Sequence, residues 1–232
     1  MKRSTINELL RDAKAFIAGR GFYLPPFAYW SPEDWTTRGS EISEIPTNAL
    51  GWDITDFGSG DYAACGLLLF TIRNGHPRNW ETMAGKLYAE KIMVVGVDQV
   101  TPYHYHWNKT EDIINRGGGD LVVEVYNATD DDRLCDTPVT VSVDGVLRTV
   151  ASGTRIRLGP GESITLPTRL YHSFWGVGER VLVGDLSLVN DDTRDNRFLE
   201  LRGRFPDIEE DEAPLHLLVT DYERYWRTEL RR

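Results

Sequence analysis

The stretch from residue 64 to residue 190 most constrains how this chain folds. Short runs of β-branched and aromatic residues are separated there by glycine, proline, aspartate or asparagine about every 8 to 12 residues. The stretch lacks the regular helices between strands that a doubly wound parallel sheet requires. The pattern therefore predicts an all-β fold, an antiparallel sandwich or barrel. The expected strands are residues 64–72, 87–95, 97–106, 120–126, 138–143, 146–150, 154–158, 162–167, 170–176 and 180–189.

Three glycine-containing segments mark turns between these strands. Asp144 and Gly145 lie between two valine-rich runs, and such an Asp-Gly pair predicts a two-residue hairpin. The runs 117–119 and 159–161 predict two further tight turns, at which the chain is expected to reverse.

The residues before the strand-rich stretch predict one helix and an irregular covering arm. Thr5 and Glu8 have the spacing of a capping box, and apolar residues then recur at helical spacing as far as Gly19. Residues 22–60 are rich in proline and tryptophan, which prevents long regular elements but supplies large apolar surfaces for packing.

The end of the chain combines an acidic run with an amphipathic stretch. Most of the run 209–212 is expected to be a solvated surface, and residues 215–226 to form the amphipathic stretch. We expect the whole chain to be one domain. Its expected parts are residues 1–60 (helix and covering arm), 64–190 (barrel) and 191–232 (C-terminal segment).

Charge and cysteine content restrict the partners and the compartment. With 26 Lys and Arg against 36 Asp and Glu, the formal net charge is −10, which repels phosphate backbones and anionic lipid. No stretch approaches the roughly 18 uninterrupted apolar residues of a membrane span, and charges interrupt any signal-like N-terminal run. Cys65 and Cys135 have no metal-ligand spacing, so we expect reduced thiols. These features predict a cytoplasmic protein that binds neither nucleic acid nor membranes.

Three histidines and one glutamate form the strongest candidate site. His104 and His106 are two residues apart on an expected strand, so their imidazoles share one face. Glu111 follows a turn at Asn108 and Lys109, and we expect it on the adjacent limb of a hairpin. Two histidines and a carboxylate are a ligand set for a divalent transition metal. His172, in a distant strand, completes a fourth position.

This spacing resembles the two motifs of the cupin superfamily. The first motif is matched by His104, His106, Glu111 and Gly118, with Gly96 two residues further upstream than usual. The second motif is matched at three positions, Gly161, Pro167 and His172, and departs from the family at two, Arg169 and Gly176. The departures predict a different local turn but leave the ligand types intact.

More narrowly, the chain resembles the cupin-type sugar isomerases of the D-lyxose isomerase family. The segments that carry this resemblance are 24–27 (LPPF), 30–35 (WSPEDW), 51–57 (GWDITDF), 88–93 (YAEKIM), 100–107 (VTPYHYHW), 111–119 (EDIINRGGG) and 204–212 (RFPDIEEDE). The resemblance implies an antiparallel cupin β-barrel (double-stranded β-helix or jelly roll) and a homodimer. It also implies a bound Mn(II), or a similar Co, Fe, Ni or Zn ion.

The activity that the resemblance implies is reversible conversion of an aldose into its ketose through an enediol or enediolate. D-lyxose or D-mannose would give D-xylulose or D-fructose. Lys91 interrupts an apolar run, where a charge is costly unless it faces a polar cavity, and the resemblance favours an acid/base role for it. Glu209 or Asp207 is the expected carboxylate partner, and Lys109 is expected to bind a substrate oxygen.

Three other functions are compatible with parts of this pattern. Non-haem iron dioxygenases use two histidines and a carboxylate, although a third histidine argues against that class. An isomerase of phosphorylated sugars would need a basic pocket, which the acidic composition does not favour. A sugar-binding or seed-storage-like cupin would hold sugar without changing it.

Overall fold

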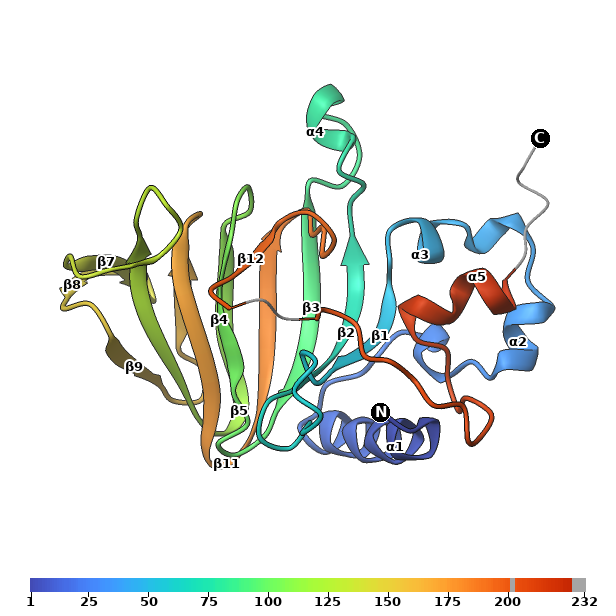
Figure 1. Cartoon of the computed structure of the whole chain (residues 1–232). Helices are drawn as coiled ribbons and strands as arrows, with labels where there is room; N and C mark the ends of the chain where they lie inside the picture. The colour runs from blue at the N-terminus through green and yellow to red at the C-terminus, as the bar shows by residue number, and fades with distance from the viewer. Residues whose placement is uncertain (201–202, 227–232) are drawn as a thin grey trace.

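A twelve-stranded antiparallel sheet curls into a barrel in this computed structural model, which describes residues 1–200 and 203–226 (Figure 1). Residues 201–202 and 227–232 of the expected C-terminal segment lie outside the described residues. The strands are β1 (Gly51–Thr55), β2 (Leu67–Asn74), β3 (Tyr88–Val95), β4 (Thr101–His106), β5 (Glu111–Ala128), β6 (Leu134–Cys135), β7 (Val139–Val143), β8 (Val146–Val150), β9 (Thr154–Leu158), β10 (Ser163–Leu166), β11 (Leu170–Leu188) and β12 (Asn196–Phe198).

The helices lie outside this barrel, and all but the first are short. None of those in the described residues is long and apolar enough to span a membrane. The α-helices are α1 (Arg3–Gly19), α2 (Pro32–Thr36), α3 (Glu44–Thr47), α4 (Asn79–Thr82) and α5 (Tyr222–Tyr225). The 3-10 helices are η1 (Pro26–Tyr29), η2 (Ser40–Ile42) and η3 (Val219–Asp221).

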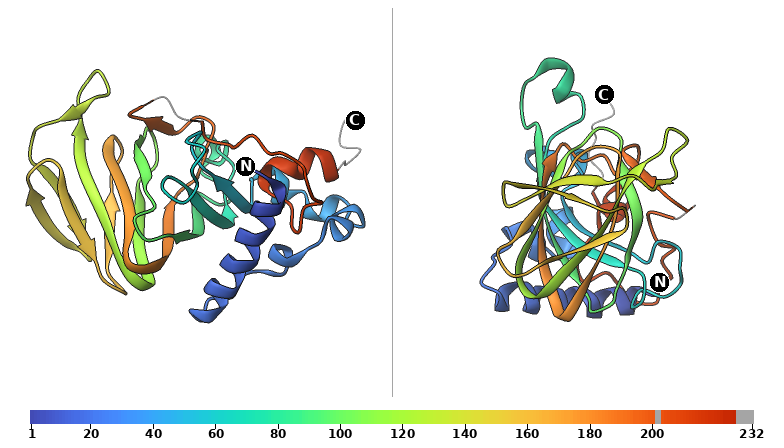
Figure 2. Two further views of the ribbon diagram at one scale, coloured as in Figure 1. Left: turned by 60° about the horizontal axis from the view of Figure 1, so that its bottom comes forward. Right: turned by 90° about the vertical axis from the view of Figure 1, so that its left-hand side faces the viewer.

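One apolar core fills the barrel. Seen end-on, the strands surround a common axis (Figure 2). The inward residues of facing strands, such as Leu69, Met93, Val123 and Val183, form one buried cluster. Alternate residues point inward because successive side chains of a strand lie on opposite faces of the sheet. The predicted antiparallel β-barrel is confirmed.

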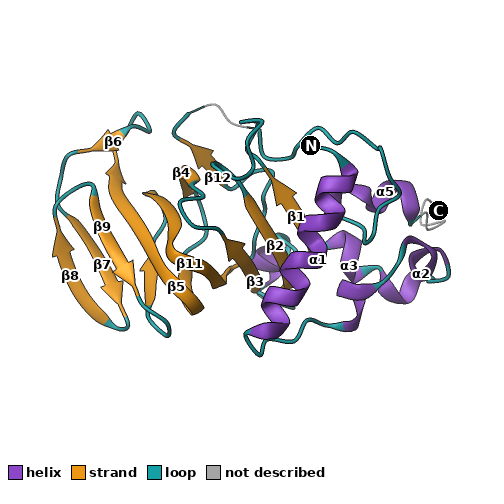
Figure 3. Ribbon diagram, turned by 90° about the horizontal axis from the view of Figure 1, so that it is seen from below, coloured by secondary structure: helices purple, strands orange, loops and turns teal. Residues whose placement is uncertain are grey.

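A second core attaches the N-terminal part of the chain to the outside of the barrel. Helix α1 lies across β1, β2 and β3, and the arm continues beyond it (Figure 3). Ile6 and Leu10 of α1 belong to the same buried cluster as Trp52, Phe70 and Ile92 of those strands. The expected covering layer is therefore present, but residues 51–55 form edge strand β1 rather than irregular chain. Asp53 and Thr55 of this strand are polar but buried, so the sequence does not show the pattern of apolar residues expected of a buried strand.

The predicted reversal at residues 117–119 is wrong. Strand β5 runs through these glycines without turning back, and β11 likewise joins two expected strands into one. The pairing of β5 with β11 shifts register there, between Val177 and Val181. A Cβ on Gly118 would lie 2.0 Å from the carbonyl oxygen of Arg180. The glycines therefore bend two paired strands and allow their close approach. The turns at Asp144–Gly145 and 159–161 form as predicted.

Helix α1 begins without the predicted capping box. It starts at Arg3, and the N-cap residue Lys2 makes no side-chain cap hydrogen bond. The backbone N–H of Arg3 instead donates to the carbonyl of Glu209 over 2.8 Å. The acidic run beginning at Glu209, most of which was expected to be a solvated surface, is therefore attached to the start of α1. Its further contacts are Arg3–Glu210 at 2.8 Å, Ser4–Asp211 at 2.7 Å and Asn7–Glu212 at 3.0 Å.

Candidate active site

Three strands bring the four predicted metal ligands together inside the barrel. His104 and His106 are on β4, and His172 of β11 lies directly opposite His104 in the pairing of the two strands. Glu111 is the first residue of β5. The expected hairpin between β4 and β5 is wrong, because β4 pairs with β11 and β12.

The potential ligand atoms of these four residues converge on one point. They all lie within 4.8 Å of one another. His172 Nε2 is 3.1 Å from both His104 Nε2 and Glu111 Oε1, and His106 Nε2 is 3.2 Å from the same carboxylate oxygen. All four side chains are at most 9% exposed. The cluster is therefore compact and shielded from bulk water.

Backbone carbonyls face the other ring nitrogen of each histidine. His104 Nδ1 lies 2.8 Å from the carbonyl of Pro102, and His172 Nδ1 lies 3.0 Å from that of Leu170. The corresponding distance from His106 Nδ1 to the carbonyl of Asp195 is 3.3 Å. A carbonyl can only accept, so each Nδ1 is the protonated nitrogen and each Nε2 presents a lone pair to the cluster.

The electrostatics of the cluster favour neutral imidazoles beside an ionised carboxylate. Burial, reinforced by the neighbouring His172, lowers the pKa of His104 well below its usual value, and burial also lowers that of His106. Burial alone would raise the pKa of Glu111, but the buried ammonium of Lys109 helps to hold it well below its ordinary value.

This donor set fits a divalent metal ion. Three imidazole lone pairs and one carboxylate oxygen are all acceptors, and two of the lone pairs face each other across 3.1 Å. Such an arrangement is repulsive unless a positive charge lies between the groups. Imidazole and carboxylate ligands suit Mn, Fe, Co, Ni and Zn, and the carbonyls on Nδ1 orient the rings as in known metal sites.

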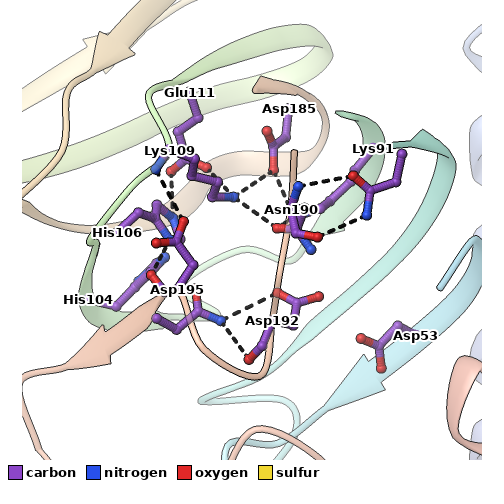
Figure 4. A network of polar contacts seen from close by, with 12 residues as sticks. Asp53, Lys91, His104, His106, Lys109, Glu111, Asp185, Asn190, Asp192 and Asp195 are labelled. Carbon is purple, nitrogen blue, oxygen red and sulfur yellow. Dashed lines mark hydrogen bonds and ion pairs between the residues drawn. The ribbon is translucent and has the colours of Figure 1, made fainter. Parts of the chain in front are cut away.

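Beside the histidines, two buried lysines share one carboxylate and one amide (Figure 4). Lys91 Nζ lies 3.2 Å from Asp185 Oδ2 and 2.6 Å from Asn190 Oδ1. Lys109 Nζ lies 2.9 Å from Glu111 Oε2, 3.1 Å from Asn190 Oδ1 and 3.8 Å from Asp185 Oδ2. Burial lowers the pKa of Lys109, but Glu111 and Asp185 more than offset this, so it stays above its usual value. Lys109 is therefore an ammonium cation.

One cavity joins these groups. It is lined by Lys91, Lys109 and Asp185, together with His104, His106 and Glu111, and on its other walls by apolar side chains such as Phe57 and Phe198. Asp185 Oδ1 is buried and has no hydrogen-bond partner in the described part of the chain. The cavity therefore contains a carboxylate oxygen with an unshared lone pair.

Asp185 was missed by the sequence reasoning, although a usable signal was present. It interrupts the apolar run of β11 as Lys91 interrupts that of β3, and the two residues are cross-strand partners. Asp195 was also missed. Its carboxylate accepts from the backbone N–H groups of Asn108 (2.7 Å) and Lys109 (3.2 Å) and holds the turn before Glu111. No local pattern marks that role.

The two expected partners of Lys91 lie elsewhere. Both Glu209 and Asp207 are exposed, beside the start of α1, and neither lines the cavity. The Glu209 carboxylate is 4.0 Å from Lys2 Nζ and 68% exposed, and the carbonyl of Asp207 accepts from the N-terminal amine. This placement contradicts the position predicted for both carboxylates, and a catalytic role for either stays a prediction.

Known proteins share the sequence of this chain over nearly its whole length. The sequence model of the D-lyxose isomerase family matches residues 1–222. The chain is 50% identical, over 97% of its length and 99% of the relative, to a D-lyxose/D-mannose isomerase of Serratia proteamaculans. The chain belongs to the D-lyxose isomerase family. A second D-lyxose/D-mannose isomerase, from Escherichia coli O157:H7, is 47% identical over 97% of this chain and all of the relative.

Solved structures share the fold of this family member at low sequence identity. An L-ribose isomerase variant of Acinetobacter sp. DL28, in complex with L-ribose, is 14% identical with a TM-score of 0.59 over 90% of this chain and 98% of its own. The L-ribose isomerase of Cellulomonas parahominis is 17% identical with a TM-score of 0.57 over the same shares. These similarities support the cupin-type barrel.

Proposed function

We propose that this protein is a metal-dependent aldose–ketose isomerase that converts D-lyxose or D-mannose into D-xylulose or D-fructose. The observation that carries the proposal is the single cavity in which a three-histidine, one-carboxylate cluster lies beside Asp185 and two lysines. The names of the two close relatives indicate the sugars.

The proposed metal ligands are His104, His106, Glu111 and His172. We propose Mn(II) as the resident ion, with Co, Fe, Ni and Zn ions as candidates that the same donors accept. When bound, the ion supplies Lewis acidity towards oxygens of the substrate. The chain's own contribution is a dry, preorganised set of donors, because all four side chains are buried.

Asp185 is the proposed proton carrier. Isomerisation of an aldose moves one proton from C2 to C1 and another from O2 to O1. A single carboxylate can take the proton from C2 and return it to C1, and Lys91 is the proposed acid/base group for the proton on the oxygens. Lys91 ion-pairs with Asp185 Oδ2 at 3.2 Å, and Oδ1 has no hydrogen-bond partner among the described residues. In this scheme Lys91 keeps its predicted acid/base role, with Asp185 rather than Glu209 or Asp207 as its carboxylate partner.

Lys109 is the proposed electrostatic stabiliser. Its ammonium lies between Glu111 and Asp185, so it faces the part of the cavity where negative charge develops on the substrate oxygens. A cation placed there before the reaction lowers the energy of the enediolate without reorganising during the step.

Replacing Asp185 by Asn tests this assignment. We expect Asp185→Asn to retain metal and fold but to lower kcat for D-lyxose by at least about 100-fold, because the amide cannot accept the C2 proton. Glu209→Gln serves as the matched control and keeps wild-type turnover. The measurements are ketose formation, metal content by mass spectrometry, and incorporation of solvent deuterium into product, which follows from proton transfer through a carboxylate.

The opposite pattern would contradict the scheme. Wild-type turnover in Asp185→Asn, with little turnover in Glu209→Gln, would return the role to the C-terminal segment. Binding of sugar without any ketose formation by the wild-type protein would indicate a non-catalytic cupin. Oxygen consumption with Fe(II) would indicate a dioxygenase.

We also propose that the protein is a cytoplasmic homodimer. The segment around α4 projects from the barrel and exposes Trp80 (41%) and Met83 (66%), with Tyr88 (48%) at its base, and exposed apolar groups of this kind are common at interfaces. Light scattering on the purified protein tests the dimer, and cell fractionation tests the location.

A further inference from the structure

Two sequence segments that the proposed chemistry does not use meet at the cavity. The first is 51–57, which supplies Asp53, and the second is 204–212, which begins with Arg204. Arg204 Nη2 lies 2.6 Å from Asp53 Oδ2 and 3.1 Å from Asp192 Oδ2. One guanidinium nitrogen thus binds two carboxylates that are far apart in sequence.

The terminal nitrogen Nη1 of this guanidinium has no hydrogen-bond partner among the described residues. Arg204 lines the cavity, and its side chain is 13% exposed. Its Nη1 is buried and forms no hydrogen bond to any part of the chain that the structure describes. A buried cationic donor without an acceptor is costly, so such groups in a binding cavity indicate where a ligand oxygen binds.

Arg204 is not the only such group in the cavity. Among the described residues, five buried side-chain atoms lack a hydrogen-bond partner, and three of them belong to residues that line this cavity. These three are Thr101 Oγ1, Asp185 Oδ1 and Arg204 Nη1. Their concentration in one place is expected of a site that binds a polyhydroxylated molecule, which brings its own donors and acceptors.

The position of Arg204 indicates which end of the sugar it meets. The reacting carbons C1 and C2 must lie at Asp185 and the histidine cluster. Arg204 instead pairs with Asp53 and Asp192, and Figure 4 shows Asp53 on the far side of Asp192 from the histidines. The chain of an open sugar that extends away from C1 and C2 can therefore reach Arg204.

We propose that Arg204 is a substrate-binding residue whose Nη1 donates a hydrogen bond to a hydroxyl on C4 or C5 of the sugar, and that Asp53 and Asp192 hold it in place. This inference rests on the proposed isomerase function and adds a specificity determinant to it. It also gives the covering arm a role in the site, because Asp53 belongs to edge strand β1.

The first test replaces Arg204 by Lys and measures binding without turnover. Arg204→Lys keeps the positive charge that the two carboxylates need but lacks the second guanidinium nitrogen. By calorimetry on the Mn(II)-loaded protein, we expect D-arabinitol, the alditol of D-lyxose, to bind about 10- to 100-fold more weakly. The matched control is Arg157→Lys on β9, where the side chain is 62% exposed and pairs with Asp120. It leaves the affinity unchanged.

The second test removes the sugar hydroxyl instead of the arginine. For wild-type protein, we expect kcat/KM to be about 10- to 100-fold lower for one deoxy analogue than for D-lyxose. This is the 4-deoxy or the 5-deoxy analogue, whichever lacks the hydroxyl that Arg204 binds. In Arg204→Lys that penalty should disappear, while kcat for D-lyxose changes less than KM. If Arg204 had only a structural role, Arg204→Lys would lower kcat/KM by the same factor for D-lyxose and for both deoxy analogues.

The outcomes separate the two proposals. An inactive wild-type protein contradicts the isomerase function. An active wild-type protein, with unchanged alditol affinity and unchanged deoxy-sugar penalties in Arg204→Lys, overturns the assignment of Arg204. If Arg204→Lys does not fold, as judged by circular dichroism, Asp53→Asn carries the test. In Asp53→Asn, Arg204 keeps its ion pair with Asp192 but loses the one with Asp53. We expect the difference in kcat/KM between D-lyxose and the deoxy analogue to become smaller in this variant.

Discussion

At the scale of single residues, each clustered histidine has its ligand geometry set by a backbone carbonyl on Nδ1. For His104 and His172 that carbonyl belongs to the residue two positions earlier in the same strand. A strand can therefore fix the tautomer of its own histidine, without help from another side chain. The Nε2 lone pairs are then directed at one point before any ion arrives.

Replacing His104 by Ala tests whether this point is the metal site. One of four donors is lost, so we expect the affinity for Mn(II) to fall at least about tenfold. Metal content after dialysis against a chelator and titration calorimetry both measure this. His76→Ala is the matched control, because the side chain of His76 lies outside the cluster, with Nδ1 accepting from the backbone N–H of Arg78. An equal metal affinity in both variants would contradict the assignment.

The candidate site was predictable where its signal was local. The spacing of His104 and His106 fixes a shared face of one strand, and Lys91 stands out as a charge in an apolar run. Asp185 carries that same signal on its own strand. Arg204 could not have been identified this way, because its function depends on Asp53 and Asp192, which only the fold brings to it.

At the scale of elements, the glycines of β5 act on the pairing of two long strands. Gly117 and Gly118 both have positive φ, +127° and +111°. A Cβ on Gly117 would meet nothing within 4 Å, whereas one on Gly118 would meet the Arg180 carbonyl. The sequence indicates that the backbone changes direction at these glycines, but it does not distinguish a turn that reverses the chain from a bend within one strand. That distinction depends on whether another strand continues alongside.

Comparing Gly118→Ala with Gly117→Ala isolates this close approach. Both variants carry backbone strain from positive φ, but only the first has the steric clash. We expect Gly118→Ala to lower the free energy of unfolding by about 1–3 kcal/mol more than Gly117→Ala, measured by urea denaturation. Equal decreases in the free energy of unfolding would mean that β5 and β11 can accommodate a side chain at residue 118.

At the scale of the whole molecule, helix α1 and residues of the segment 203–226 pack against each other on the outside of the barrel. The short β-branched and aromatic runs between turn residues predicted the barrel, and the tryptophans of the arm predicted a covering layer. The contacts between α1 and the acidic run were not predictable, because solvated and paired carboxylates have the same composition. His216 belongs to this contact: its Nδ1 lies 2.9 Å from the carbonyl of Trp30, and its Nε2 lies 2.6 Å from Lys14 Nζ.

His216 makes the contact between α1 and residues 203–226 sensitive to acid. Burial, with the nearby charges of Lys14 and Arg11, lowers the pKa of His216 below its ordinary value of 6.5. Below that pH the unfolded chain binds a proton that the folded protein does not, so stability falls as the pH decreases. The slope from this one group approaches about 1.4 kcal/mol per pH unit.

We therefore expect His216→Gln to lose less stability than wild-type protein between pH 7 and pH 5, as measured by urea unfolding with saturating Mn(II). The amide can accept from Lys14 and does not titrate, so the difference between the two curves reports the proton on His216. His76→Gln should follow the wild-type curve. Parallel curves for wild-type and His216→Gln would mean that this histidine is protonated equally in both states, and that the contact between α1 and residues 203–226 does not respond to acid through it.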